Sequence, residues 1–284
     1  MNKLSGPVKN IFENMSSSLR QLQLNNNIFT STLPDSLTNC TNLMYFDISY
    51  NSISGRLPPF NGLKKIQYFL VSHNQFSGTI PSTMLVNRNH SHAAELKVLD
   101  LSSNSFEGPL SGFLSSDLNL SNLEYLNINT NFFSGTVSIP MVNSATPKLE
   151  TVVLSQNCFT GLTSVDVFCS ALSLELLHMG MLHRTKSKGK VRSCNGRKQP
   201  SFGKLDSLSC LFGSDRKLKT LVLTGLELEG TIPSISDSSN LSQLLLSFNK
   251  LTGIMYISFS LLLITHTILQ IRHPSRRVSI FWKI

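Results

Sequence analysis

The chain has 284 residues, of which 40% are hydrophobic and 14% charged, and its formal net charge at pH 7 is +9. Twelve of its 25 Lys and Arg residues lie in two segments without acidic residues, 184–204 and 272–284. The rest of the chain is acidic, with thirteen basic and 16 acidic residues, a net charge of −3. The basic total therefore does not indicate a nucleic-acid-binding domain, because the excess charge is confined to two short segments.

One phrase recurs along the chain with small variations, first as LRQLQLNNNIFTSTLP from Leu19. Further copies begin at Leu43, Ile66, Leu96, Leu123, Leu149, Leu218 and Leu241. Their shared pattern is L-x-x-L-x-L-x-x-N-x-F/L-x-G-x-I/L-P. Apolar residues two positions apart, such as Leu22 and Leu24, predict a short strand with one apolar face. Because one copy cannot bury that face alone, the repetition predicts a solenoid of stacked copies.

Two columns of residues follow the predicted strands and are expected to be structural. An asparagine amide has both donors and an acceptor, so it can satisfy backbone groups where the chain turns out of a strand. This asparagine ladder consists of Asn27, Asn51, Asn74, Asn104, Asn131, Asn157 and Asn249. Two positions later comes a column predicted to form an apolar spine: Phe29, Ile53, Phe76, Phe106, Phe133, Phe159 and Leu251.

The end of each copy carries a more specific signature, an S-G-x-I/L-P tail, present as SGRLP at 54–58 and SGTIP at 77–81. This tail resembles the plant-specific class of leucine-rich repeat. That class occurs in the ectodomains of plant receptor-like kinases and receptor-like proteins, and in polygalacturonase-inhibiting proteins. The resemblance covers about residues 2–253 with one gap. It implies an α/β-type leucine-rich-repeat solenoid, a right-handed superhelix with a parallel concave β-sheet and few true helices.

The spacing of the copies divides the chain into segments. We predict plant-type repeats over 1–173, a degenerate repeat with a basic insert over 174–217, and two further repeats over 218–253. Longer intervals predict loops near 87–92 and 142–147. The degenerate copy from Leu174 has Leu182 in the asparagine position, and the copy from Leu218 has Leu226 there. Stacking is expected to be poorest around this last copy.

The segment after the repeats has two interpretations. Residues 254–271 carry no formal charge and are followed by a basic tail, 272–284. An 18-residue helix is about 27 Å long, close to the roughly 30 Å of a bilayer core. The arginines after it would then place the C-terminus in the cytoplasm and the repeats outside. The alternative is out-of-register translated sequence that replaces the next repeat, since no further copy of the pattern can be threaded through 254–284.

Five cysteines and five glycosylation sequons bear on the compartment. Cys40 is expected to be a small buried residue. The pairs Cys158–Cys169 and Cys194–Cys210 are two candidate disulfides in an oxidising environment, and the sequence leaves the pairing open. Their spacing with histidines fits no standard zinc module, so no metal site is predicted. The N-x-S/T sequons favour the secretory pathway and are at Asn14, Asn39, Asn89, Asn119 and Asn240. The sequence begins within a repeat, without a signal peptide or the family's N-terminal cap, so a fragment or truncated gene model is expected.

Outward-facing strand positions supply the candidate ligand site. We predict an aromatic and acidic strip on the concave face because tyrosines with a polar tip are frequent in binding hot spots. Its residues are Tyr45, Asp47, Tyr68, His73, Asp100, Tyr125 and Asn127. The resemblance implies binding of peptides, steroids or protein partners on the inner and lateral surface. The alternative is that these tyrosines merely cover the sheet.

The chain contains no glycine-rich loop, H-R-D, D-F-G, G-x-S-x-G or H-E-x-x-H motif, so we predict no enzymatic activity and no cofactor. The favoured function is a receptor-like module at the plasma membrane, with extracellular repeats. It would bind a peptide, small molecule or protein for signalling or defence, together with a co-receptor kinase and without nucleic acid. The alternatives are a secreted or cell-wall inhibitor of a cell-wall-degrading enzyme and a truncated non-functional remnant.

Overall fold

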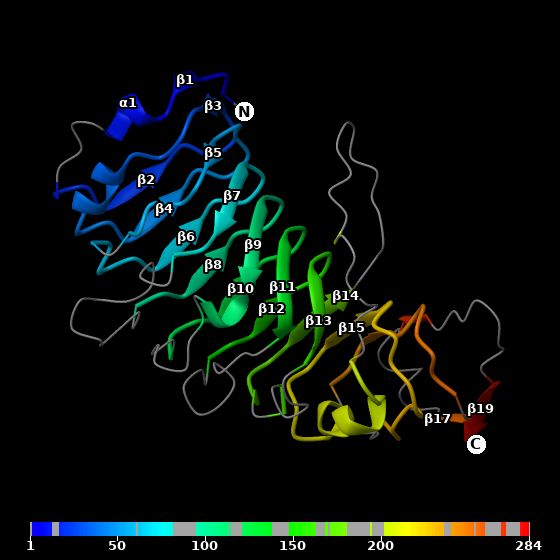
Figure 1. Ribbon diagram of the computed structural model, residues 1–284. Coiled ribbons are helices and arrows are strands. Elements are labelled where there is room, and N and C mark those ends of the chain that lie inside the picture. The colour runs from blue at the N-terminus through cyan, green and yellow to red at the C-terminus, as the bar shows by residue number, and fades with distance from the viewer. Residues whose placement is uncertain are drawn as a thin grey trace.

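The chain forms a β-solenoid whose successive turns stack from the N-terminus to the C-terminus (Figure 1), which confirms the predicted fold. The computed structural model describes residues 2–12, 17–60, 62–81, 95–112, 114, 121–137, 148–162, 168–169, 171–180, 194, 202–235, 240–252, 254–258, 268–270 and 279–283. Within these residues, the single α-helix is the short α1 (Lys9–Phe12), and three 3₁₀ segments are η1 (Asp35–Asn39), η3 (Leu110–Gly112) and η6 (Leu205–Phe212).

One face of the solenoid is a ten-stranded parallel sheet, here called the inner sheet, to which each repeat contributes one strand (Figure 1). The second residue of each of its first nine strands points into the core; Leu99 and Leu126, for example, are 0% exposed. The residues on either side therefore face outward. In spatial order the strands are β2 (Gln21–Gln23), β4 (Tyr45–Asp47), β6 (Tyr68–Leu70), β8 (Val98–Asp100), β10 (Tyr125–Asn127), β12 (Thr151–Val153), β14 (Leu176–Gly180), β15 (Thr220–Thr224), β16 (Gln243–Leu245) and β18 (Ile268–Gln270).

A second parallel sheet begins where each repeat leaves the asparagine ladder. Its strands are β5 (Ser54–Gly55), β7 (Gln75–Thr79), β9 (Ser105–Pro109), β11 (Phe132–Val137) and β13 (Cys158–Leu162), while β1 (Ser5–Pro7) pairs separately with β3 (Ile28–Thr30). The glycine of the S-G tail has positive φ in this sheet, for example +87° at Gly55 and +80° at Gly78. Only glycine takes up that conformation without strain, which explains its recurrence.

The apolar column lies between the two sheets and forms the centre of the core. Phe76, Phe106 and Phe133 are each 0% exposed. The Phe76 and Phe106 rings are stacked with centroids 6.0 Å apart, and the Phe106 and Phe133 rings are 6.2 Å apart. The spine therefore links consecutive repeats as well as filling each one.

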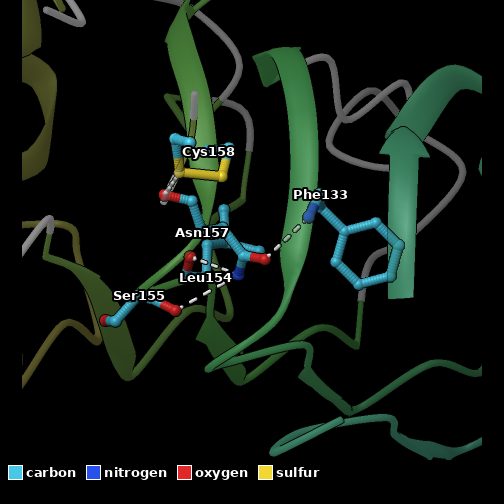
Figure 2. The surroundings of a disulfide bond; sticks show 6 residues. Phe133, Leu154, Ser155, Asn157 and Cys158 are labelled. Atoms are coloured by element: carbon cyan, nitrogen blue, oxygen red, sulfur yellow. Dashed lines mark hydrogen bonds between the residues drawn. A yellow bond between two sulfur atoms is a disulfide. The ribbon is translucent and has the colours of Figure 1, made fainter. Parts of the chain in front are cut away.

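The ladder asparagines hydrogen-bond to the neighbouring repeat as well as to their own. Figure 2 shows Asn157, whose Nδ2 donates to the carbonyl oxygens of Leu154 at 3.1 Å and Ser155 at 3.2 Å. The same nitrogen reaches Ile128 O of the preceding repeat at 2.9 Å, and Oδ1 accepts the Phe133 N–H at 3.1 Å. Each such residue thus ties two turns of the solenoid together through buried polar groups.

The residue before each ladder asparagine has a left-handed backbone, although none of the seven is glycine. The φ angles of Asn26, Tyr50, His73, Ser103, Thr130, Gln156 and Phe248 lie between +52° and +61°. In the copy where Leu226 replaces the asparagine, the preceding residue is Gly225, with φ +66°. The turn geometry is therefore kept even where the ladder side chain is missing.

The described parts of the segment 174–217, strand β14 and the 3₁₀ segment η6, belong to the solenoid, and the expected poor stacking around the copy from Leu218 is wrong. Strand β14 pairs with β15 over five residues, from Leu176 opposite Thr220 to Gly180 opposite Thr224. The apolar 3₁₀ segment η6 supplies core residues, among them Leu205 at 0% and Leu208 at 1% exposure. These core residues come directly after the insert in the sequence, so the apolar core continues on its C-terminal side.

The C-terminal residues differ from the expected helix over 254–271, because the described parts of that range are strands. Strand β17 (Ile254–Ser258) pairs with β19 (Ser279–Lys283), and β18 pairs with β16 at the edge of the inner sheet. The inner sheet thus continues beyond the last recognisable copy. In the part of the chain that the structure describes, no helix combines the length and apolar character needed to cross a membrane.

The disulfides link Cys158 to Cys194 and Cys169 to Cys210, so neither of the two local candidate pairs forms. Cα–Cα distances are 5.5 and 5.6 Å. The Cys158–Cys194 bond joins the repeat around β13 to the insert, and the Cys169–Cys210 bond joins it to η6. The first of these bonds lies beside the ladder residue Asn157 (Figure 2). Cys40 is a buried free thiol, as predicted.

Several predicted features fall outside the described residues. These are the loops near 87–92 and 142–147, Leu182, most of the basic run over 184–204, and the sequons at Asn14, Asn89 and Asn119. The other two sequon asparagines, Asn39 and Asn240, are exposed. Burial therefore does not hinder glycan attachment at Asn39, whereas Nδ2 of Asn240 donates a hydrogen bond to Arg216 O at 2.7 Å.

Candidate functional site

Two rows of outward-facing residues cross the inner sheet at the predicted ligand site. The first row aligns Tyr45, Tyr68, Val98 and Tyr125 on β4, β6, β8 and β10. Two residues further along the same strands, the second row aligns Asp47, Leu70, Asp100 and Asn127. The parallel register therefore brings six of the seven predicted site residues onto one face. The seventh, His73, lies in the turn after β6.

The tyrosines form one pair and one separate residue, so the predicted strip is not continuous. The Tyr45 and Tyr68 rings have centroids 5.2 Å apart and are tilted by 33°. Strand β8 lies between Tyr68 and Tyr125, and it carries Val98 in this row. Because adjacent strands are about 4.8 Å apart, the backbones of Tyr68 and Tyr125 are roughly 10 Å apart.

The phenol groups of Tyr45 and Tyr125 are held in their neutral form. Burial raises the pKa of Tyr125, and the nearby carboxylate of Asp100 raises it further. Burial and the charge of Asp47 likewise raise the pKa of Tyr45. In addition, Asn127 Nδ2 donates to the Tyr125 hydroxyl oxygen at 3.2 Å, which orients that phenol. Both hydroxyls thus remain hydrogen-bonding groups at physiological pH.

The second row has a structural task that the sequence pattern did not reveal. Asp47 Oδ1 accepts the Ser49 N–H at 2.9 Å, and Asp100 Oδ1 accepts the Ser102 N–H at 2.9 Å. Asn127 Oδ1 accepts the N–H two residues later at 3.1 Å in the same manner. Asp47 is only 8% exposed, so its predicted role as a freely presented acidic residue is not supported by its position. Asp100 is half-buried and retains access to solvent.

His73 has an aromatic partner that was not among the predicted site residues. Its ring stacks on Tyr50 with centroids 4.1 Å apart and an interplanar angle of 12°. Tyr50 is 51% exposed. Both residues have a left-handed backbone and directly precede a ladder asparagine. Because they hold the same position in adjacent repeats, the sequence alignment could have predicted that their side chains are neighbours. The stack extends the aromatic surface of β4 and β6 beyond the strand ends.

The inner sheet changes character beyond β10. Its outward residues there are mostly apolar or hydroxyl-bearing, as with Val153, Leu176 and Val222. His178 lies opposite Val153 and Val222, and burial lowers its pKa. Within the described residues, no three His, Cys, Asp or Glu side chains are grouped to hold a metal ion.

Comparisons with known proteins agree with this architecture. Leucine-rich repeat family profiles match residues 17–76 and 95–117. The ectodomain of the Arabidopsis receptor kinase HAESA, solved with an N-terminally extended IDA peptide hormone, is 27% identical with a TM-score of 0.67. That match covers 88% of this chain and 37% of HAESA. HAESA has also been solved with IDA and the co-receptor SERK1, a match at 23% identity and a TM-score of 0.61 over 95% of this chain and 45% of that one.

Two other receptor structures are similar. The TDR receptor is 26% identical with a TM-score of 0.59, over 93% of this chain and 44% of that chain. PEPR1 in complex with AtPEP1 is 24% identical with a TM-score of 0.67, over 89% of this chain and 31% of PEPR1, and this likeness shows the fold alone. The chain thus spans less than half the length of each of these receptor structures.

Proposed function

Because this chain is a leucine-rich-repeat protein of the plant receptor-ectodomain type, we propose that its inner sheet binds an extracellular peptide or protein ligand and performs no chemistry on it. The observation that carries the proposal is the alignment of Tyr45, Tyr68 and Tyr125 on the outward face of β4, β6 and β10. Half-buried tyrosines provide large contact areas with few side-chain torsions to immobilise. The peptide-hormone complex of HAESA supports a ligand of this kind.

An extracellular location is part of this proposal. The two disulfides Cys158–Cys194 and Cys169–Cys210 require an oxidising compartment to persist. The exposed sequons at Asn39 and Asn240 are consistent with passage through the secretory pathway. A co-receptor kinase is the proposed second partner, by analogy with the HAESA complex that contains SERK1.

A peptide-display experiment tests the ligand site. The full chain is secreted from plant cells, immobilised and exposed to a random heptapeptide library. The test variant replaces Tyr45, Tyr68 and Tyr125 by Ala, whereas a matched control replaces Thr151, Thr220 and Gln243, which lie on the same face beyond β10. We expect the wild-type chain and the control to enrich the same peptides and the tyrosine variant to lose them. If the folded tyrosine variant enriches the same peptides as the wild-type chain, the proposed ligand site is wrong.

A further inference from the structure

The formally charged residues in the strands of the inner sheet are all acidic, which limits the class of ligand that the sheet would bind. Among the residues of its ten strands, Asp47 and Asp100 are the only Asp, Glu, Lys or Arg. Burial lowers the pKa of His178, which disfavours a positive charge on this side chain. The chain as a whole is basic, with its excess in 184–204 and 272–284, so this sheet differs in sign from the net charge. Strand residues that carry carboxylates and no lysine or arginine favour a cationic partner.

The residue row through β6, β8 and β10 places a short side chain between two aromatic ones. Val98 lies between Tyr68 and Tyr125 in register. Asp100 lies two residues beyond Val98 on the same strand and face, close enough to Tyr125 to raise the pKa of its phenol in addition to the larger effect of burial. The backbones of the outer strands of this row are roughly 10 Å apart, so a ligand side chain above Val98 would lie between the two tyrosine positions. Ring faces attract a cation that lies within about 6 Å of their centroids.

We propose that the row Tyr68, Val98 and Tyr125 binds one arginine or lysine side chain of a peptide ligand, with Asp100 as its counter-ion. The inference rests on the proposed function, since it names the ligand class of the same site. Arginine fits better than lysine, because its planar guanidinium stacks on tyrosine while it donates to a carboxylate.

Asp100 is a better counter-ion than Asp47 for two reasons. Asp47 is 8% exposed, whereas Asp100 is half-buried and reachable from solvent. The tyrosines beside Asp47 are already in contact, with ring centroids 5.2 Å apart, and leave no position between them for a ligand side chain. Of the two carboxylates in the second row, Asp100 is therefore accessible to a ligand, whereas Asp47 is largely shielded from one.

The chain itself supplies a variant that removes the charge and keeps the fold. Asp100 Oδ1 accepts the Ser102 N–H, and Asn127 Oδ1 makes the corresponding bond in the next repeat. An asparagine is thus already accommodated at this position of the repeat, and Asp100→Asn should fold normally. Asn127→Asp is the converse change, which adds a carboxylate beside Tyr125. Asp35→Asn removes an exposed carboxylate from η1, outside the sheet, and serves as the control.

The test uses the full secreted chain and the peptides that it enriches from the random heptapeptide library. The strongest binder is resynthesised with each basic residue replaced by citrulline, which has the shape of arginine without its charge. We expect enriched peptides to share a basic residue and citrulline to weaken binding about tenfold or more in isothermal titration calorimetry. Asp100→Asn should lower the affinity for the arginine peptide to that for the citrulline peptide. Asn127→Asp should raise the affinity for the arginine peptide, and Asp35→Asn should leave it unchanged.

Three outcomes would overturn the inference, and they distinguish its failure from the failure of the proposed function. If peptides without a basic residue are enriched, and the tyrosine triple variant loses them, the cation assignment is wrong and the proposed function stands. If no peptide depends on the tyrosines, both the ligand class and the proposed function fail. Equal affinity for the arginine and citrulline forms also rejects the cation assignment.

Discussion

Asn249 completes the hydrogen bonding of a repeat in which Leu226 occupies the ladder position. Its Oδ1 accepts two backbone N–H groups from that repeat, those of Leu226 at 2.9 Å and Leu228 at 3.2 Å. Its Nδ2 donates to Leu223 O at 2.6 Å and Leu246 O at 3.0 Å. The ladder therefore bridges the position where the sequence pattern fails, because the asparagine of the next repeat reaches back across the boundary.

Replacing Asn249 by Ala should destabilise the solenoid strongly, because the change leaves buried donors and acceptors without partners. We expect a loss of about 1–3 kcal/mol in the free energy of unfolding. Asn27→Ala is the matched control, since Asn27 is at the N-terminal end of the ladder and its Oδ1 accepts a bond from the exposed Leu4. Urea titration of both variants measures the difference, and a similar loss for the two would contradict this role of Asn249.

The disulfide pairing predicts a specific cross-linked peptide. Non-reducing proteolysis and mass spectrometry should recover Cys158 joined to Cys194, and Cys169 joined to Cys210. The double variant Cys158→Ala, Cys194→Ala should lose about 2–4 kcal/mol of stability, because the bond closes a loop with a sequence separation of 36 residues. A fragment that joins Cys158 to Cys169 would show the pairing described above to be wrong.

Cys40 should be unreactive while the chain is folded. Its side chain is fully buried, and burial raises the pKa of its thiol, so little thiolate forms and reagents have no access. Iodoacetamide at pH 8 should label no cysteine in the native chain and one cysteine in the urea-unfolded chain. Labelling of Cys40 at equal rates in both states would show that the repeat around η1 opens readily.

His178 should make stability depend on pH below neutrality. Burial lowers its pKa in the folded state, so the unfolded chain, with a histidine pKa near 6.5, binds more protons as the pH falls. The stability that His178 contributes is present above about pH 6.5 and is lost as the pH falls through the folded pKa.

Urea unfolding at pH 7.5 and 5.5 tests this contribution of His178. We expect the wild-type chain to lose more stability between the two pH values than His178→Gln does. An identical pH dependence in His178→Gln would assign the effect to other groups.

The candidate site shows how far a repeated sequence pattern can predict a surface. Because the copies align without gaps through the strands, the sequence correctly placed Tyr45, Tyr68 and Tyr125 in one row. It did not predict that Asp47 is buried by its own turn, or that Tyr50 stacks on His73. Those features depend on side-chain direction and on left-handed backbone angles, which a one-dimensional pattern does not encode.

By itself, the amino-acid sequence determined the solenoid, its core columns and the asparagine ladder, because each follows from a short-range pattern that recurs in every turn. The tertiary structure decided the features that depend on distant segments. It paired Cys158 with Cys194 rather than with Cys169, and it placed 268–270 as strand β18 beside β16 at the edge of the inner sheet. Both depend on which residues the stacked turns bring together, and cysteine pairing and strand partners are not specified by any local repeat.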